Sequence, residues 1–461
     1  MPRLTFVMAF ATVLIGLSSA HGGGMGGMGG GGMGGSMPGG IGGPPIGGGF
    51  PMGSAIPMGG GSPTGSGSLL DMISPRGHEM SGEEMSAAVH AMQRDMVGRP
   101  TAGLSAALEH DDRGAEVVRG EVIAVSPSDA QLDVARHLRF RILRHDDLDA
   151  LGISCVTLRA PEGMSTVQAL AALRVADPGG SYDYAHVYNP SGSTPATGDP
   201  ASLPPPVRVK DVTVGMIDGG IEEHHGSLRG VDLEVRSFAD GRASPPTVHG
   251  TAVASLLVGQ ARDFSGYLPG ASLYAADVFG GTANGGSAVN IARALDWLAD
   301  NNIAVVNISL TGPPNKLLEA AVRAFLAKGH VLVAAVGNDG PSAPPNYPAS
   351  YPGVIAVTSV DTTRHLQLDA NQDNSGFAAV GVNVRAANLP QGYASFTGTS
   401  YAAPAVTASA AMLLPKPDIA GAKSALAELM HASAPLNGYG RNALHLIAPS
   451  ALMVSAVKSH E

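Results

Sequence analysis

Short apolar runs alternate with longer amphipathic stretches through the C-terminal half of the chain. The runs are rich in β-branched residues and predict buried strands, whereas the stretches repeat apolar residues at helical spacing. Strands are predicted near residues 212–218, 234–238, 272–279, 304–310, 330–336 and 354–360. Helices are predicted near residues 249–259, 287–300, 315–328 and 400–413. This alternation predicts an α/β fold, with a mostly parallel sheet, helices on both faces and a site at the carboxyl ends of the strands.

An earlier region, residues 117–188, has a different order of elements. Its spacing predicts a strand, a helix, two strands, a second helix and a last strand, at residues 117–125, 128–140, 141–143, 153–158, 165–175 and 182–188. That βαββαβ order predicts a small split-βαβ, or ferredoxin-like, domain. A linker rich in Pro, Ser and Gly, residues 189–207, joins it to the α/β domain at 208–445 and should be accessible to proteolysis. One or two helices are predicted beyond residue 418, before a tail at 446–461.

The sequence patterns of the N-terminal segments differ from those of a folded domain. Residues 1–20 combine Arg3, an apolar stretch and small residues at the end, which is the pattern of a secretion signal. Residues 21–67 are Gly, Met and Pro with little else, so we expect them to be disordered. Their spaced methionines leave open a site for a soft metal such as Cu(I). A capping-box pattern at Ser81 lies within a helical connector predicted over residues 68–116.

Composition narrows the class of protein. The 461 residues carry 28 basic and 38 acidic side chains, a net charge of −10, without a basic cluster. Nucleic acid is therefore not an expected partner. The single cysteine, Cys155, excludes an intrachain disulfide, and no segment after the signal is long and apolar enough to span a membrane. An α/β nucleotide-binding domain is disfavoured, because no Gly-x-Gly-x-x-Gly lies between a strand and a helix in the required setting.

Residues at three element boundaries are candidates for nucleophilic catalysis. Ser400 lies at the predicted start of a helix, in Gly398-Thr399-Ser400, where a hydroxyl can serve either as a nucleophile or as an N-cap. Asp218 ends a predicted buried strand, and His249 begins a predicted helix. A serine nucleophile needs a base, and the base needs an acid that fixes its tautomer. The three residues fit Ser400 as nucleophile, His249 as base and Asp218 as orienting acid.

Such a reaction also needs a donor for the negative oxygen that develops on the substrate carbonyl. Asn338 follows a predicted buried strand on a glycine turn, Gly337-Asn338. It is the predicted oxyanion donor, with the backbone N–H of Ser400 beside it. All the parts of an acyl-transfer site are therefore present in the sequence.

With these segments in this order, the chain resembles the subtilisin-like serine peptidases, or subtilases. The resemblance covers about residues 208–445 and rests on Asp218-Gly219, His249-Gly250-Thr251, Gly337-Asn338, and Gly398-Thr399-Ser400 with Ala403-Pro404. It implies that the unit at 117–188 is an inhibitory propeptide and that an edge segment pairs with substrate backbone. The implied substrate-binding residues are Ser309, Leu310, Thr311, Gly312, Ala335 and Gly337. None of these is a carboxylate, which favours an uncharged, medium to large apolar side chain before the cut.

Three positions depart from the family pattern. Where two histidines and a methionine are common, this chain has Ala252, Ala405 and Tyr401. None of the three breaks bonds, and the alanines are expected to repack helices behind the site. The sequence therefore predicts a secreted serine endopeptidase that forms an acyl-enzyme and processes its own precursor. A catalytically silent subtilisin-like peptide-binding module is the alternative.

This chemistry requires no cofactor. Calcium is frequent in the resembled family, but no residue here is assigned to it, so calcium stays open. His224 and His225 beside two glutamates invite a zinc site, yet adjacent residues lack the spacing of zinc ligands, and a solvated loop is expected. The expected partners are protein or peptide substrates and the chain's own propeptide, with no stable membrane span once the signal is removed. The expected location is extracellular or periplasmic.

Overall fold

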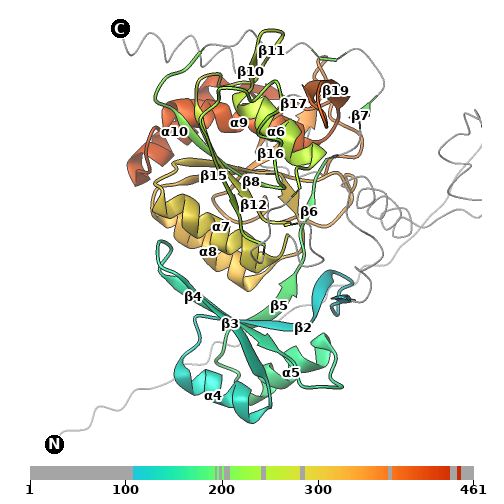
Figure 1. Ribbon diagram of the computed structural model, residues 1–461, viewed down its shortest axis with the longest axis vertical. Coiled ribbons are helices and arrows are strands. Elements are labelled where there is room, and N and C mark those ends of the chain that lie inside the picture. The colour runs from blue at the N-terminus through green and yellow to red at the C-terminus, as the bar shows by residue number, and fades with distance from the viewer. Residues whose placement is uncertain are drawn as a thin grey trace, which may run out of the picture. The chain divides into compact units, whose positions relative to one another are not determined.

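A nine-stranded sheet runs through the C-terminal half of the chain (Figure 1). Its order is β20-β21-β17-β16-β15-β13-β8-β12-β9, and every neighbouring pair is parallel except β20 with β21. The strands are β8 (Thr213–Asp218), β9 (Leu233–Ser237), β12 (Ser272–Asp277), β13 (Val305–Ile308), β15 (Val331–Ala335), β16 (Ile355–Val360), β17 (Phe377–Val380), β20 (Ala434–Leu436) and β21 (Leu444–Leu446). This computed structural model describes residues 107–192, 195–196, 200–201, 208–239, 245–280, 286–371, 376–436 and 444–447, which belong to one compact unit.

Helices cover both faces of this sheet (Figure 1). One face carries α6 (Val248–Val258), α9 (Thr399–Leu413) and α10 (Ile419–Ala432), and the other carries α7 (Ala288–Asp300) and α8 (Lys316–Ala327). Successive strand residues point to opposite faces. Met216 of β8 accordingly packs in the core on the α6 side and Ile217 in the core on the α7 side, both fully buried. Because both faces are apolar, polar side chains collect where the strands end.

The α/β fold predicted from the sequence is confirmed. The predicted strands and helices of this half are present within a few residues of their expected bounds, and α10 lies where a further helix was expected. The pattern did not predict β17 or β21, nor the hairpin of β18 (Val384–Ala387) and β19 (Tyr393–Phe396). Strands of three or four residues are too short to show a period.

Residues 107–190 contain a second, antiparallel sheet. Its strands are β1 (Leu108–His110), β2 (Glu116–Val125), β3 (Arg141–Leu148), β4 (Ile153–Arg159) and β5 (Tyr182–His186), and its helices are α4 (Asp129–His137) and α5 (Thr166–Ala176). After β1 the order of elements is the expected βαββαβ. Ser128 and Ser165 begin the two helices with capping boxes, each closed by a glutamine three residues on. Cys155 of β4 is fully buried, and burial raises the pKa of its thiol to about 12.

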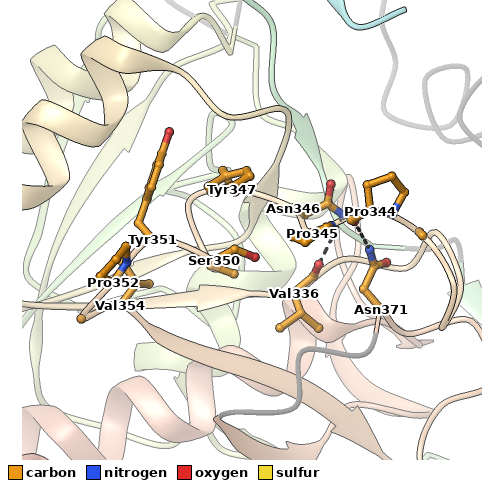
Figure 2. A pocket seen from close by; sticks show the side chains of 13 residues that line it. Val336, Pro344, Pro345, Asn346, Tyr347, Ser350, Tyr351, Pro352, Val354 and Asn371 are labelled. Carbon is orange, nitrogen blue, oxygen red and sulfur yellow. Dashed lines mark hydrogen bonds between the residues drawn. The ribbon is translucent and has the colours of Figure 1, made fainter. Parts of the chain in front are cut away.

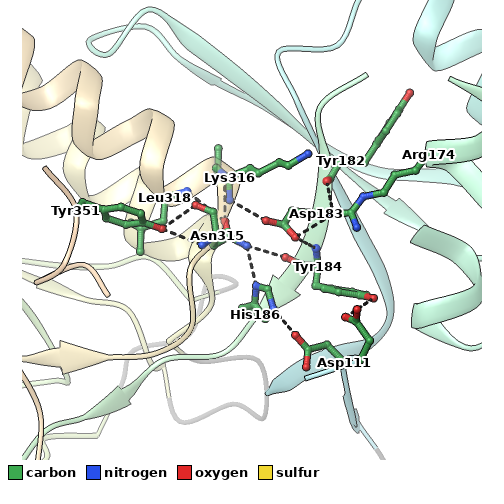
Figure 3. A network of polar contacts seen from close by, with 12 residues as sticks. Asp111, Arg174, Tyr182, Asp183, Tyr184, His186, Asn315, Lys316, Leu318 and Tyr351 are labelled. Carbon is green, nitrogen blue, oxygen red and sulfur yellow. Dashed lines mark hydrogen bonds and ion pairs between the residues drawn. The ribbon is translucent and has the colours of Figure 1, made fainter. Parts of the chain in front are cut away.

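A polar network joins β5 to the start of α8 (Figure 3). Asn315 is the N-cap of α8, and its Oδ1 accepts from the N–H groups of Leu317 and Leu318 at 3.0 and 3.2 Å. Its Nδ2 donates to the Tyr184 carbonyl at 2.9 Å and lies 3.0 Å from His186 Nδ1. One amide therefore caps a helix beneath the large sheet and holds the last strand of the smaller one.

Several predicted segments lie outside the described residues. These are the signal peptide at 1–20, the Gly/Met/Pro-rich segment at 21–67, the helical connector up to residue 106, and the tail beyond residue 447. Of the helices that the structure describes, none combines the length and apolar character needed to cross a membrane.

Replacing Asn315 tests the link between β5 and α8. Asn315→Ala should lower the free energy of unfolding by ~1 kcal/mol for the lost cap and by a further ~1–3 kcal/mol for the buried Tyr184 carbonyl left without its donor. Asn315→Ser keeps a hydroxyl oxygen for the cap and loses the amide donor to Tyr184, so its loss should be smaller. Urea denaturation of the full chain in a Ser400→Ala background measures both. Equal stability of Asn315→Ala and the parent would contradict the assignment.

Candidate active site

Ser400 is the second residue of α9 and is fully buried beneath a strand of the chain itself. The N-cap of α9 is Gly398, at φ +154°, and no side chain caps the helix. The hydroxyl of Thr399 accepts from the Gly337 N–H at 3.1 Å, and Ser400 Oγ lies 3.3 Å from the Ser309 carbonyl. The N-cap interpretation of Ser400 is therefore wrong, and its Oγ instead lies 2.8 Å from Ser191 Oγ, in the segment bound at the site.

Asp218 and His249 are brought together in the same region. Asp218 ends β8, and its Oδ1 accepts from the Gly219 N–H at 2.7 Å and lies 2.9 Å from His249 Nδ1. Both side chains are buried, at 0% and 5% exposure. Of the described residues, none offers a hydrogen-bond partner to Asp218 Oδ2 or His249 Nε2. With Nδ1–H committed to the carboxylate, Nε2 is the nitrogen that can accept a proton.

Asn338 follows β15, and its amide has a fixed orientation. Its Oδ1 accepts from the Thr399 N–H at 3.1 Å and from Gln367 Nε2 at 3.0 Å. Its Nδ2 consequently points away from both and donates to the Ser191 carbonyl, which also accepts from the Ser400 N–H at 3.4 Å. Two donors on one carbonyl oxygen, one of them at a helix N-terminus, form the geometry that stabilises an oxyanion.

A segment upstream of the large sheet occupies the site. β6 (Asn189–Pro190) pairs antiparallel with β14 (Leu310–Thr311), and the Ser191 N–H donates to the Ser309 carbonyl at 3.1 Å. The Tyr188 side chain is fully buried, and its hydroxyl donates to the Pro313 carbonyl at 2.7 Å. This is the addition of an extended peptide to a sheet edge. The peptide bond beside Ser400 is Ser191–Gly192, so a serine precedes it and not the medium to large apolar side chain that the sequence favoured.

The predicted substrate-binding residues fall into two groups. Ser309, Leu310, Thr311 and Gly312 lie along the bound segment, with Gly312 against the Tyr188 ring. Ala335 is the buried end of β15, and Gly337 donates to Thr399. The structure thus brings the first group into contact with a peptide, whereas the second supports the start of α9.

Asn346 and Gln367 were not identified from the sequence. A Cβ on Gly337 would lie 2.3 Å from Asn346 Nδ2, which donates to the Val336 carbonyl at 3.3 Å and to Asp339 Oδ2 at 2.6 Å. Asn346 also lines a cavity of about 400 Å³ formed largely by residues 343–354 (Figure 2). Both residues lie in loops without periodicity, so only three-dimensional contacts identify them.

The positions that depart from the family pattern lie close behind the site. Ala252 and Ala405 are buried in one core where α6 and α9 meet. Tyr401 is 2% exposed, with its ring centroid 5.6 Å from that of His249. Burial, assisted by the charge of Asp218, raises the pKa of Tyr401, so its hydroxyl stays neutral. His225, one of the residues weighed for zinc, is buried and not solvated as expected, with its ring nitrogens at 2.7 Å from Ser227 Oγ and 3.0 Å from the Gly392 carbonyl.

Comparison with known proteins agrees with this geometry. The model of the subtilase family matches residues 209–446. Subtilisin Savinase of Lederbergia lenta is 35% identical over 215 residues, covering 44% of this chain and 77% of that protein. The minor extracellular protease Epr of Bacillus subtilis (strain 168) is 33% identical over 212 residues, covering 44% of this chain and 32% of that protein. The structure of fervidolysin from Fervidobacterium pennivorans, a keratinolytic enzyme related to subtilisin, matches in fold, with a TM-score of 0.61 at 19% identity over 73% of this chain and 61% of that one.

The chain therefore belongs to the subtilase family. Its class of activity is that of a subtilisin-like serine endopeptidase, acting on peptide bonds.

Gln367 offers a test of how Asn338 is oriented. Gln367→Met keeps the side-chain length and removes the donor to Asn338 Oδ1, a loss of ~0.5–1.5 kcal/mol. We expect kcat to fall about 2- to 12-fold with KM little changed, because the amide acts on the developing charge. Leu368→Ala is the matched control, since Leu368 follows Gln367 in the sequence and its side chain is 93% exposed. Unchanged kcat in Gln367→Met with lowered thermal stability would assign Gln367 a purely structural role.

Proposed function

We propose that the chain hydrolyses peptide bonds through an acyl-enzyme formed on Ser400, with His249 as base and Asp218 as the residue that orients it. The observation that supports this most directly is the Ser191 carbonyl, which accepts hydrogen bonds from Asn338 Nδ2 and the Ser400 N–H. A carbonyl held in this way next to a serine hydroxyl is the arrangement that acyl transfer requires.

Each step of the reaction has a residue to perform it. His249 Nε2 takes the proton from Ser400 Oγ as that oxygen bonds to the carbonyl carbon before the cut. The negative charge moves to the carbonyl oxygen, where the Asn338 amide and the Ser400 N–H stabilise it. As the carbonyl reforms, the C–N bond breaks and the imidazolium proton passes to the leaving amine. Water then attacks the ester with the same base, releasing the acid and restoring Ser400.

The first substrate in this proposal is the chain's own Ser191–Gly192 bond, which lies within the linker predicted at 189–207. The part upstream of the cut has contacts that do not depend on that bond. Tyr188 stays buried, β6 stays paired with β14, and the Leu151 N–H donates to Asp296 of α7 at 3.0 Å. Residues 107–191 should therefore remain bound after cleavage and act as an inhibitor until they are degraded.

Export completes the proposal. The first 20 residues have the features of a secretion signal, and one relative is named as an extracellular protease. A catalytically silent peptide-binding module would keep the same cleft but would not react with a fluorophosphonate. Labelling of Ser400 by such a probe supports the enzyme, and absence of labelling in correctly folded, processed protein supports the module.

Self-processing gives a direct test of Ser400. The full chain should yield a large fragment that begins at Gly192, identified by N-terminal sequencing and intact mass. Ser400→Ala removes one oxygen, so it should fold and accumulate uncut, and His249→Ala should do the same because the hydroxyl then lacks its base. Expression in a host without other exported proteases is the necessary control. A Gly192 terminus in Ser400→Ala would show that another enzyme makes the cut.

Tyr188 should strengthen recognition of a separate substrate. A peptide with the sequence of residues 186–196 is expected to be cut between its Ser and Gly. Replacing the tyrosine of that peptide by alanine should lower kcat/KM about 10- to 150-fold, since burial of a large apolar side chain contributes ~1.5–3 kcal/mol. Steady-state hydrolysis of the two peptides measures this. Equal kcat/KM values would show that the Tyr188 contact belongs to the precursor alone.

A further inference from the structure

The residue on the leaving-group side of the proposed cut has no room for a side chain. A Cβ built on Gly192 would lie 2.8 Å from His249 Cδ2, 2.9 Å from His249 Nε2 and 2.9 Å from the Tyr401 hydroxyl oxygen. Real Cβ atoms essentially never come within 3.0 Å of another heavy atom. Even the smallest side chain at this position therefore requires both rings, or the bound segment itself, to move.

Neither ring can move at low cost. His249 is buried, and its Nδ1 lies 2.9 Å from the Asp218 carboxylate, which is itself held by the Gly219 N–H. Tyr401 is buried within the first turn of α9, and its ring centroid lies 5.6 Å from that of His249 and 5.1 Å from that of Phe396. Close packing of this kind resists even the volume of one methyl group.

We propose that Tyr401, together with His249, forms a leaving-group subsite selective for glycine, so that the enzyme cuts peptide bonds that precede a glycine. This inference rests on the proposed function, because it uses the same cut. Tyr401 is the residue that sets the selectivity, since His249 is needed for the chemistry and cannot be varied. A smaller or more flexible side chain at position 401 would open the subsite to alanine and larger residues.

A peptide series measures the selectivity directly. The probes are four peptides with the sequence of residues 186–196, carrying Gly, Ala, Ser or Leu at the position of Gly192 and otherwise identical. The wild-type kcat/KM should fall about 10- to 200-fold from Gly to Ala, the range found for one added carbon in a confined site. Serine and leucine should be cut no faster than alanine. Comparable cleavage of the Gly and Ala peptides by the wild-type enzyme would overturn the proposal.

Variants of Tyr401 assign the selectivity to this residue. The readout is the ratio of kcat/KM for the Ala peptide to that for the Gly peptide within each variant, so overall losses of activity cancel. Tyr401→Ala should raise this ratio without bringing it to one, because the contacts with His249 remain, and Tyr401→Phe, which removes only the hydroxyl, should raise it by less. If Tyr401→Ala does not fold, as judged by circular dichroism and loss of a cooperative thermal unfolding transition, the Tyr401→Phe ratio decides. An unchanged ratio in a labelled variant would overturn the role of Tyr401.

The full chain provides a complementary test. Gly192→Ala should accumulate as uncut precursor, and the double variant Gly192→Ala with Tyr401→Ala or Tyr401→Phe should regain cleavage after Ser191. Asn189→Ala is the control, because its backbone pairing with Thr311 survives the change and cleavage should persist. Normal processing of Gly192→Ala would contradict the proposal. If the wild-type protein neither reacts with the fluorophosphonate nor cuts any peptide, the proposed function fails. If it reacts with the fluorophosphonate but cuts all four peptides equally, only the selectivity proposal fails.

Discussion

The carbonyl oxygen of Ser191 accepts hydrogen bonds from a side chain that follows one strand and from the backbone at the start of a helix, and these bonds connect parts of the chain that are far apart in sequence. Asn338 reaches the oxygen from the end of β15, and Ser400 reaches it from the first turn of α9. Gly398 permits the approach, because a Cβ there would lie 3.1 Å from Gly192 Cα and 3.3 Å from the Ser191 oxygen. Ser400, Asn338 and the bound strand are thus linked to one another through a single atom.

The sheet explains why these groups meet. From β8 the chain proceeds to β9 and β12 on one side, then to β13 and β15 on the other, so the strand order reverses direction beside β8. Helices diverge at such a point and leave a crevice outside the carboxyl ends of the strands. Asp218 ends β8, and Ser309 follows β13 at that edge. A buried network continues from Ser309 through Asn307 to Thr407 of α9, fixing the helix over the crevice.

The sequence predicted the parts of the site that lie at the ends of regular elements. Asp218, His249, Asn338 and Ser400 each adjoin a strand or helix whose period is readable, so their meeting follows from the fold. Gln367 and Asn346 act through contacts between loops, which have no period. The composition of residues 189–207 predicted a linker but not which of its peptide bonds lies beside Ser400. That bond is determined by how Tyr188 and β6 pack against β14 and the residues that follow it. The fold and the residues of the candidate site were therefore predictable from the sequence. The loop residues that hold them, and the segment bound in the site, were not.

The position of Cys155 relative to the Ser191–Gly192 bond has a consequence for the chemistry of the chain. It is the only sulfhydryl in the sequence, and it lies upstream of that bond, buried in β4. A thiol with a pKa raised to about 12 is almost entirely protonated at neutral pH and reacts slowly with oxidants and alkylating reagents. The proposed cut after Ser191 would therefore leave a peptidase part without any thiol, insensitive to thiol reagents and unable to form mixed disulfides in an oxidising environment.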